Sequence, residues 1–311
     1  MINISQGHEK SISIETLIKS FFLIPSKHLS QINLYANKEV LLKNFRDCGL
    51  NLKLEKNNIY LSRDRQIKCT FIEGDEKSSS FESLNRAIQD TSSNDILVTQ
   101  PTTKDKFKLK KDIFAGHTDY FRKVLFSDTT MNFISDTEQI LLLTDHIPIE
   151  MVPNSIKLKK SVSQIDISIR ELKKFFNRKI DNVLISGINP HAGESGLISN
   201  SDDIIKNICE ELSEKFQHIR FVGPIPSDTK YMMINDPKTT LQVFCHHDQA
   251  LTYFKFKTGF LGVNTSFGLN FLRLSVDHGT ACELYGKNLA NPLGCYYVLK
   301  TAIEINERLK S

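Results

Sequence analysis

Short apolar runs alternate with amphipathic segments along most of the chain. The apolar runs predict strands at residues 31–36, 95–99, 182–186, 221–222 and 241–245. The amphipathic segments between them predict helices at residues 38–48, 161–176 and 202–216. An alternation of strand and helix is typical of a largely parallel α/β sheet.

The helix at 161–176 has the clearest pattern. Its apolar residues recur at spacings of three and four, which places them on one face: Val162, Ile165, Ile169, Leu172 and Phe176. At 202–216, Asp202 and Asp203 suit the positive N-terminal end of a helix. The polar stretch 73–92 predicts a surface excursion with a short helix.

Composition sets limits on the class of protein. A chain of 311 residues forms one large domain or two medium ones, and 40% hydrophobic with 24% charged residues is an ordinary soluble composition. A net charge of +4 is too small to indicate a nucleic-acid partner. No apolar run has the length of a membrane span, and the polar N-terminus lacks the apolar region of a signal peptide.

Six cysteines occur without any CxxC pair. We expect them to be reduced and mostly buried, in a cytoplasmic protein. This pattern favours neither disulfides nor a cysteine zinc site.

Histidines follow three of the apolar runs. His146 comes after 141–143, His191 after 183–185, and the pair His246 and His247 after 241–245. Ligand sites of open α/β sheets form at the carboxyl ends of strands, so we expect His146, His191 and one residue of the pair to converge.

Three neutral imidazoles suit a divalent transition metal that keeps one position open for substrate. Asp145 and Asp248 are then either ligands or hydrogen-bond partners of ligands. Any one of these histidines taken alone is better explained as a loop cap. Three at equivalent strand ends favour the metal.

Further polar residues punctuate the second half of the chain. Lys255, Asn264 and Arg273 lie nine residues apart in an apolar region. A lysine with an arginine in such a setting suits a phosphate or carboxylate, although each alone could be a surface charge and Asn264 could be a turn residue. His117 and Thr118 form a compact turn. The sequence contains no GxGxxG, P-loop or GxSxG motif. The residues alone therefore predict an α/β enzyme, metal-dependent, with a small anionic substrate.

Seven motifs, in order, resemble the 4-hydroxythreonine-4-phosphate dehydrogenase family of pyridoxal-phosphate biosynthesis. They are GHTDYF (116–121), TDHIPI (144–149), GINPHAGESG (187–196), GPIPSDT (223–229), HHDQAL (246–251), KFKTGFLGVN (255–264) and FGLNFLRLSVDHGTA (267–281). They span roughly the C-terminal two-thirds of the chain.

The resemblance implies a two-lobed α/β/α fold like that of isocitrate and isopropylmalate dehydrogenases, with the active site in the cleft between the lobes. The expected lobes are residues 1–115 plus 275–311, and residues 116–274. The resemblance also implies a homodimer.

The activity that the resemblance implies is the oxidation of 4-phosphooxy-L-threonine at its 3-hydroxyl by NAD or NADP. Loss of CO₂ would follow, giving 3-amino-2-oxopropyl phosphate, with the help of a divalent metal such as zinc, cobalt or magnesium. No membrane and no nucleic-acid partner is expected.

Matched by position, the residues take separate roles. The metal ligands would be His146, His191 and His247, because His247 is the histidine next to Asp248. The substrate contacts would be His117, Thr118, Lys255, Asn264 and Arg273. Lys104 is a candidate proton acceptor. The dinucleotide is expected near loops 187–196, 223–229 and 264–281.

The chain departs from the family pattern in three places. Its first loop, residues 5–15, lacks most of the family's glycines and prolines, Gln100 stands where glycine is usual, and Ala250 replaces the glycine after HDQ. Two alternatives therefore stay open: a related dehydrogenase of a threonate or erythronate 4-phosphate, and a catalytically weak relative that binds a phosphorylated metabolite.

Overall fold

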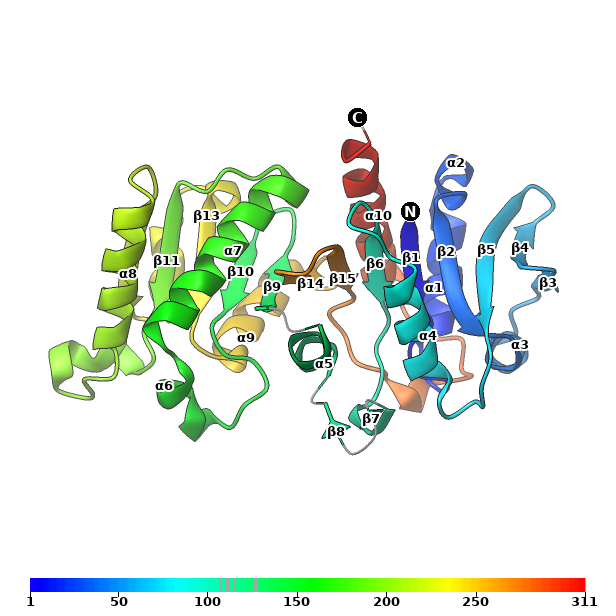
Figure 1. Cartoon of the computed structure of the whole chain (residues 1–311), viewed down its shortest axis with the longest axis horizontal. Helices are drawn as coiled ribbons and strands as arrows, with labels where there is room; N and C mark the ends of the chain where they lie inside the picture. Colours follow the sequence, from blue (N-terminus) through cyan, green and yellow to red (C-terminus); the bar gives the residue numbers. More distant parts are fainter. Residues whose placement is uncertain (107, 110–111, 115, 126–127, 311) are drawn as a thin grey trace. The chain divides into compact units, whose positions relative to one another are not determined.

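The computed structural model describes residues 1–106, 108–109, 112–114, 116–125 and 128–310. The chain forms two compact units (Figure 1). The first contains Met1–Lys123, Phe260–Val263 and Asn270–Ser311, and the second contains Val124–Gly259 and Asn264–Leu269. The predicted lobe boundaries stay a prediction, and residue 115, at which one of them was set, lies outside the described residues.

Seven strands form the sheet of the first unit, in the order β15-β6-β1-β2-β5-β4-β3. Their bounds are β1 (Ile2–Ser5), β2 (Ile32–Asn37), β3 (Lys53–Glu55), β4 (Asn58–Ser62), β5 (Arg65–Ile72), β6 (Ile96–Thr99) and β15 (Leu272–Ser275). The strands from β15 to β5 are parallel, and β4 pairs antiparallel with both β5 and β3. A separate antiparallel pair joins β7 (Lys108–Leu109) to β8 (Asp112–Ile113).

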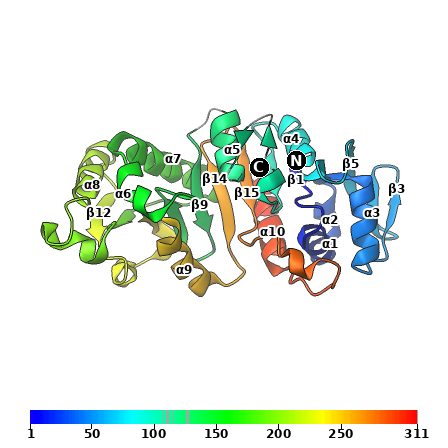
Figure 2. The same cartoon turned by 90° about the horizontal axis from the view of Figure 1, so that it is seen from below.

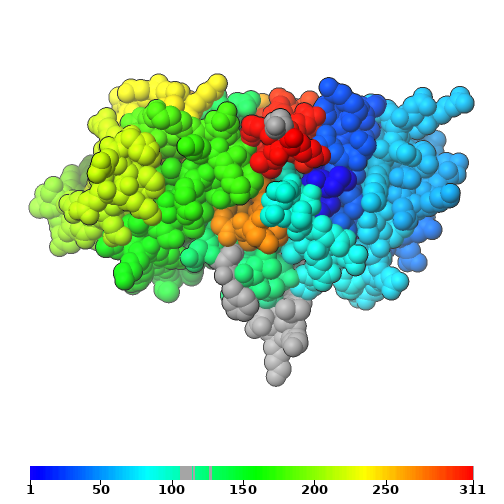
Figure 3. All heavy atoms as spheres, turned by 45° about the horizontal axis from the view of Figure 1, so that its top comes forward, coloured from blue at the N-terminus to red at the C-terminus, as the bar shows by residue number. Residues whose placement is uncertain are grey.

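Helices cover both faces of this sheet. The helices of this unit are α1 (Ser13–Leu23), α2 (Ser26–Leu29), α3 (Lys38–Asp47), α4 (Ser79–Gln89), α5 (His117–Val124) and α10 (Leu293–Arg308). Helix α4 lies on one face, and α1 and α10 lie on the other (Figure 2). Figure 3 shows α10, in red, beside the N-terminal segment, where the Met1 ammonium group donates to Asn306 Oδ1 at 3.5 Å.

The helix predicted within 73–92 is present, but it is no surface excursion. Ser79, Ser83, Leu84 and Ala87 of α4 are fully buried where the helix packs on β1 and β2. Small side chains on that face let the helix approach the sheet closely, and Ser83 Oγ donates to the Tyr35 carbonyl at 2.7 Å. The polar composition of the segment therefore concealed a packed helix.

The second unit is built on the strand order β12-β11-β13-β10-β9-β14. Its strands are β9 (Thr130–Ile134), β10 (Gln139–Leu142), β11 (Asn182–Ser186), β12 (Arg220–Ile225), β13 (Thr240–Phe244) and β14 (Val263–Phe267). Strands β12, β11, β13 and β10 are parallel, and β9 is antiparallel to β10. The largely parallel sheet predicted from the sequence is confirmed in both units.

Four helices belong to the second unit: α6 (Val152–Ser155), α7 (Leu158–Phe176), α8 (Asp203–Lys215) and α9 (His247–Thr258). Helices α7 and α8 pack on each other, while α9 packs on β10 and β13 over a cluster that includes Phe133, Leu142 and Phe254. The predicted apolar stripe of α7 is buried as far as Leu172. Its last buried position is Phe175, three residues after Leu172, rather than Phe176, and the helix ends at a left-handed C-cap, Asn177.

Short 3₁₀ helices complete the chain: η1 (Lys104–Lys106), η2 (Ile149–Met151), η4 (Lys230–Met233), η5 (Pro237–Thr239) and η6 (Cys282–Leu284). The longer segment η3 (Pro190–Gly196) contains five residues with left-handed backbone and is described below. The cysteines are free, and all but Cys282 are buried, as predicted. Within the described residues, no helix is both long enough and apolar enough to cross a membrane.

Candidate functional site

The three loops that carry the predicted metal ligands leave neighbouring strands of the second unit. His191 follows β11, His247 follows β13 and His146 follows β10. Because β13 pairs in parallel with both β11 and β10, all three loops leave the carboxyl-terminal edge of the sheet, where these strands end. The predicted placement at one sheet edge is confirmed, and the ligand roles stay a prediction.

The rings of His146 and His247 lie close together at this edge, tilted relative to each other. Their ring centroids are 5.6 Å apart, with an angle of 40° between the planes. Two imidazoles that bind one tetrahedral zinc through nitrogens at about 2.0–2.1 Å have centroids about 5 Å apart. The observed pair is therefore close to the separation that a shared metal requires.

His247 is also oriented for this role by a carboxylate. Its Nδ1 lies 2.7 Å from Asp248 Oδ1, which leaves Nε2 available to a metal. The hydrogen bond with His247 and its charge lower the pKa of Asp248. In the same loop, His246 caps α9: its Nδ1 accepts from the Gln249 amide at 3.4 Å. Burial lowers the pKa of His246. The geometry thus distinguishes two adjacent histidines that the residues alone left equivalent.

His191 stands apart from this pair. Its side chain is 64% exposed, and its Nδ1 lies 2.9 Å from Glu194 Oε1, a contact that raises the pKa of His191. Among the described residues, no group of three His, Cys, Asp or Glu side chains is arranged to hold a metal. The structure therefore brings two of the three predicted ligands together.

The turn that carries His191 has an unusual backbone. Residues 191–195 all have positive φ, between 47° and 78°, and only Gly193 among them is a glycine. The left-handed region costs a non-glycine residue about 1–2 kcal/mol. A run of this kind persists only where its surroundings hold it, and such strain clusters at functional sites.

Three loops at this edge are tied together by Gln249, to which sequence reasoning gave no role. Its side-chain amide donates to the Gly187 carbonyl at 2.9 Å and to Ser227 Oγ at 2.5 Å. Its side-chain oxygen accepts from the Cys245 amide at 2.9 Å. The loops after β11, β12 and β13 are therefore held to one another through a single side chain.

A cavity of about 500 Å³ lies beside the His191 turn. It is lined by that turn, by the first residues of α8, by Gly223 and Pro224 near the end of β12, and by Pro226 just after it. Two of the three loops predicted to bind the dinucleotide thus border one cavity, and loop 264–281 contributes none of its lining residues.

A second group of predicted residues lies in the first unit. Arg273 of β15 is 3% exposed, and its Nε and Nη2 donate to Thr99 Oγ1 at 2.9 and 2.6 Å. Its guanidinium carbon lies 5.9 Å from the ring centroid of Phe121. Burial lowers the pKa of Arg273 to about 9, so the group stays charged at neutral pH.

His117 and Thr118 belong to this second group. Burial, with the nearby charge of Arg273, keeps the pKa of His117 well below its usual value, so its imidazole is neutral at pH 7. Thr118 is 4% exposed. A buried guanidinium beside a neutral imidazole suits an anionic group of a substrate.

The remaining predicted residues, Lys255, Asn264 and Lys104, belong to three different elements. Lys255 is in the last turn of α9 and Asn264 is in β14, both within the second unit. Lys104 is exposed in η1. Thr99 was missed by sequence reasoning, although a polar residue at the end of a buried strand is the same signal that identified the histidines.

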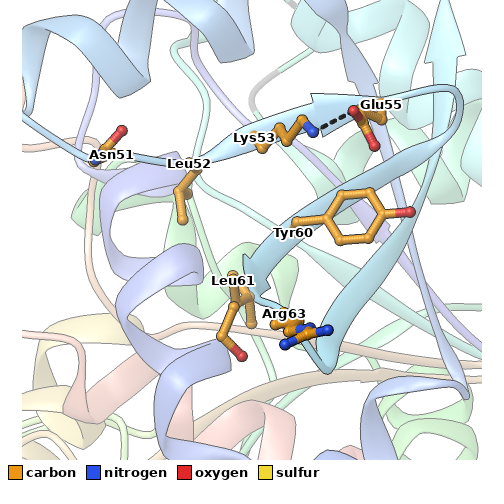
Figure 4. A pocket seen from close by; sticks show the side chains of 8 residues that line it. Asn51, Leu52, Lys53, Glu55, Tyr60, Leu61 and Arg63 are labelled. Atoms are coloured by element: carbon orange, nitrogen blue, oxygen red, sulfur yellow. Dashed lines mark ion pairs between the residues drawn. The ribbon is translucent and has the colours of Figure 1, made fainter.

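A further cavity, of about 590 Å³, lies on the β3–β4 hairpin of the first unit (Figure 4). Lys53, Tyr60 and Arg63 are among its lining residues, and Lys53 forms an ion pair with Glu55. None of the predicted site residues lines it.

Comparisons with known proteins identify the family and the fold. The sequence model of the family described as "Pyridoxal phosphate biosynthetic protein PdxA" matches residues 21–302. A 4-hydroxythreonine-4-phosphate dehydrogenase of Sulfurihydrogenibium is 29% identical over 315 residues, which are 96% of each chain. The enzyme of that name from Shewanella denitrificans is 35% identical over 222 residues, covering 70% of this chain and 66% of its own length.

Solved structures show the fold. A putative 4-hydroxythreonine-4-phosphate dehydrogenase from Salmonella typhimurium superposes with a TM-score of 0.77 at 20% identity, covering 98% of this chain and 99% of its own. Isocitrate dehydrogenase from Methylococcus capsulatus superposes with a TM-score of 0.51 at 12% identity, covering 99% and 87%. The two-lobed α/β fold expected from the sequence is confirmed. Since the family match extends over most of the chain, the protein belongs to the pyridoxal phosphate biosynthetic protein PdxA family.

Proposed function

We propose that the protein oxidises 4-phosphooxy-L-threonine at its 3-hydroxyl. The hydride goes to NAD or NADP and the hydroxyl proton goes to a base. The resulting β-keto acid loses CO₂, and protonation of the remaining carbon gives 3-amino-2-oxopropyl phosphate. The observation that carries this proposal is the close pair His146 and His247, at the ends of neighbouring parallel strands in a member of this family.

The metal would be held by His146, His247 and His191, and the spacing of the first two fits a zinc or cobalt ion. When bound, a divalent metal lowers the pKa of a coordinated hydroxyl and polarises a carbonyl. Asp248 holds the ring of His247 in the orientation that leaves Nε2 free.

Arg273 would bind an anionic group of the substrate, because its guanidinium is buried, charged at neutral pH and fixed by Thr99. His117 would hydrogen-bond to the substrate as a neutral imidazole. Thr118, Lys255 and Asn264 are the further proposed contacts.

The remaining assignments are proposals of the same kind. Lys104 is the candidate proton acceptor, and the cavity beside the His191 turn is the candidate dinucleotide site. We also propose a cytoplasmic homodimer.

The test measures NADH formation by absorbance when the protein is given 4-phosphooxy-L-threonine, NAD and a divalent metal. The 4-phosphates of threonate and erythronate are offered in parallel. We expect turnover of the amino acid substrate to exceed that of both analogues. Faster turnover of an analogue would favour the related dehydrogenase, and binding without any turnover would favour the catalytically weak relative.

A matched pair of variants links the activity to the histidine pair. His247→Ala should abolish turnover and reduce bound metal. His218→Ala changes an exposed histidine of the same unit and should leave both unchanged. Equal effects of the two substitutions would contradict the role given to His247.

A further inference from the structure

Asp202 lies immediately before α8, yet its carboxylate does not serve that helix. The sequence suited Asp202 to the helix N-terminus, but the helix begins at Asp203, and the Asp202 side chain accepts no hydrogen bond from it. The residue is only 3% exposed. A buried carboxylate needs hydrogen-bond partners, so where these lie indicates its purpose.

Both partners belong to the segment that enters the His191 turn. Asp202 Oδ1 accepts from the Ile188 amide at 2.6 Å, and Oδ2 accepts from Asn189 Nδ2 at 2.7 Å. Asn189 Nδ2 also donates to Ser201 Oγ at 2.7 Å. The carboxylate thus fixes the two residues that precede Pro190 and His191.

Two glycines of the same segment pack against this carboxylate. A Cβ atom on Gly187 would lie 2.8 Å from Asp202 Oδ1, and one on Gly193 would lie 3.0 Å from Oδ2. Gly193 would also meet the Ser199 carbonyl at 2.5 Å. Asp202 therefore occupies a space that exists because both positions lack a side chain, one before the turn and one within it.

The other hydrogen bonds of the turn are local. The Ala192 amide donates to the Asn189 carbonyl at 3.1 Å, the Leu197 amide to the Glu194 carbonyl at 3.2 Å, and the Ile198 and Ser199 amides to the Gly193 carbonyl at 3.1 and 3.5 Å. Five consecutive residues with positive φ need an external support to keep that conformation. The contacts of Asp202 supply it.

We propose that Asp202 is a positioning residue for His191: it holds the left-handed turn in the conformation that presents the imidazole as a metal ligand. This inference rests on the proposed function, since it takes His191 as a ligand. In this role Asp202 acts through the backbone and through Asn189 and does not itself bind the metal; it also lines the cavity proposed for the dinucleotide.

The test compares Asp202→Asn with Asp203→Asn. Asparagine keeps the shape of Asp202 but has one acceptor oxygen, so it loses one of the two bonds and turns an NH₂ group toward a donor. Asp203 is the matched control, because it is exposed and its carboxylate pairs with Lys206 of its own helix, at 2.7 Å. It also lines the cavity proposed for the dinucleotide, but neither measurement below contains a dinucleotide. Asn189→Ala is the second variant: it removes the bond to Oδ2 and leaves the carboxylate, so it decides the question if Asp202→Asn does not fold.

Two measurements apply to each variant. Hydrogen–deuterium exchange of the metal-free protein reports how firmly segment 188–199 is held. Titration with Co²⁺, monitored by the visible absorption of the bound ion, reports the affinity of the metal site. We expect Asp202→Asn to speed exchange in 188–199 and to weaken Co²⁺ binding by about 10–100-fold, the usual effect of losing a group that orients a ligand. Asn189→Ala should act in the same direction, more weakly, and Asp203→Asn should match the parent protein.

Unchanged exchange and Co²⁺ affinity in Asp202→Asn would overturn the proposal, as would equal losses in Asp203→Asn. His191→Ala separates this proposal from the proposed function. If His191→Ala weakens Co²⁺ binding and Asp202→Asn does not, the positioning role is wrong and the ligand set stands. If His191→Ala leaves Co²⁺ binding unchanged, the ligand set is wrong, and the positioning role falls with it.

Discussion

Substituting Thr99 by valine tests whether the buried guanidinium of Arg273 is held for an anion. Thr99 is fully buried at the end of β6, and its hydroxyl oxygen accepts from two nitrogens of Arg273, at 2.9 and 2.6 Å. Valine keeps the branched shape and removes the acceptor. The substitution therefore changes the support of the cation and leaves its charge.

The structure sets the size of the effect. A hydrogen bond to a charged group contributes about 1.5–3 kcal/mol, and one between neutral groups contributes about 0.5–1.5 kcal/mol. Thr70→Val provides the neutral comparison in the same unit, because the Thr70 hydroxyl exchanges hydrogen bonds with Asn33 at 3.0 and 3.1 Å. Thr99→Val should thus lower the free energy of unfolding by about 1.5–3 kcal/mol, and Thr70→Val by about half as much.

The assay joins urea unfolding, followed by far-ultraviolet circular dichroism, to steady-state kinetics. If the hydrogen bonds from Arg273 to Thr99 also orient Arg273 toward the substrate, Thr99→Val should raise KM, by about tenfold for each 1.4 kcal/mol of binding free energy that is lost. Thr70→Val should leave KM unchanged. Equal stability losses in the two variants, together with an unchanged KM in Thr99→Val, would refute the reasoning.

Three other predictions follow. Gly193→Ala should lower the free energy of unfolding by about 1–2 kcal/mol because of its φ of +78°, and by about 1–3 kcal/mol more because the added Cβ would lie 2.5 Å from the Ser199 carbonyl. Gly49 has a φ of +63°, and an added Cβ there would meet nothing within 4 Å, so Gly49→Ala should show only the first cost in urea unfolding. Lys230→Met should stabilise the protein by about 1 kcal/mol at pH 7, because burial lowers the pKa of that lysine well below its usual value. Above the lowered pKa the unfolded state binds more protons than the folded state, so the stability of the parent protein should rise with pH. Unfolding measured across pH should show a smaller slope of stability against pH in the variant. KM should rise as pH is raised through about 9, where Arg273 begins to lose its charge, and a flat KM to pH 10 would contradict this.

Much of the framework was predictable because burial leaves a strong pattern. Apolar runs mark strands that helices cover on both faces, so β11 was predicted with the bounds that the structure gives it. Residues that follow neighbouring parallel strands lie at the same end of those strands, which is why His146, His191 and the pair His246 and His247 could be grouped from sequence.

What the sequence could not give depends on contacts between distant residues. Thr99 and Arg273 are 174 positions apart, and the polar type of either residue does not name its partner. The left-handed turn at 191–195 runs against the preference of four of its five residues, so local propensity predicts another backbone. Its conformation is set by Asp202, whose place before α8 suggested a different role.

The most direct test of the account is the dependence of NADH formation on metal. The protein is stripped of metal and titrated with Co²⁺ or Zn²⁺ in the presence of NAD and 4-phosphooxy-L-threonine, alongside His247→Ala. We predict no turnover without metal, recovery that saturates at one ion per chain, and no recovery in the variant. Full NADH formation by the metal-free protein, or full recovery in His247→Ala, would contradict the account.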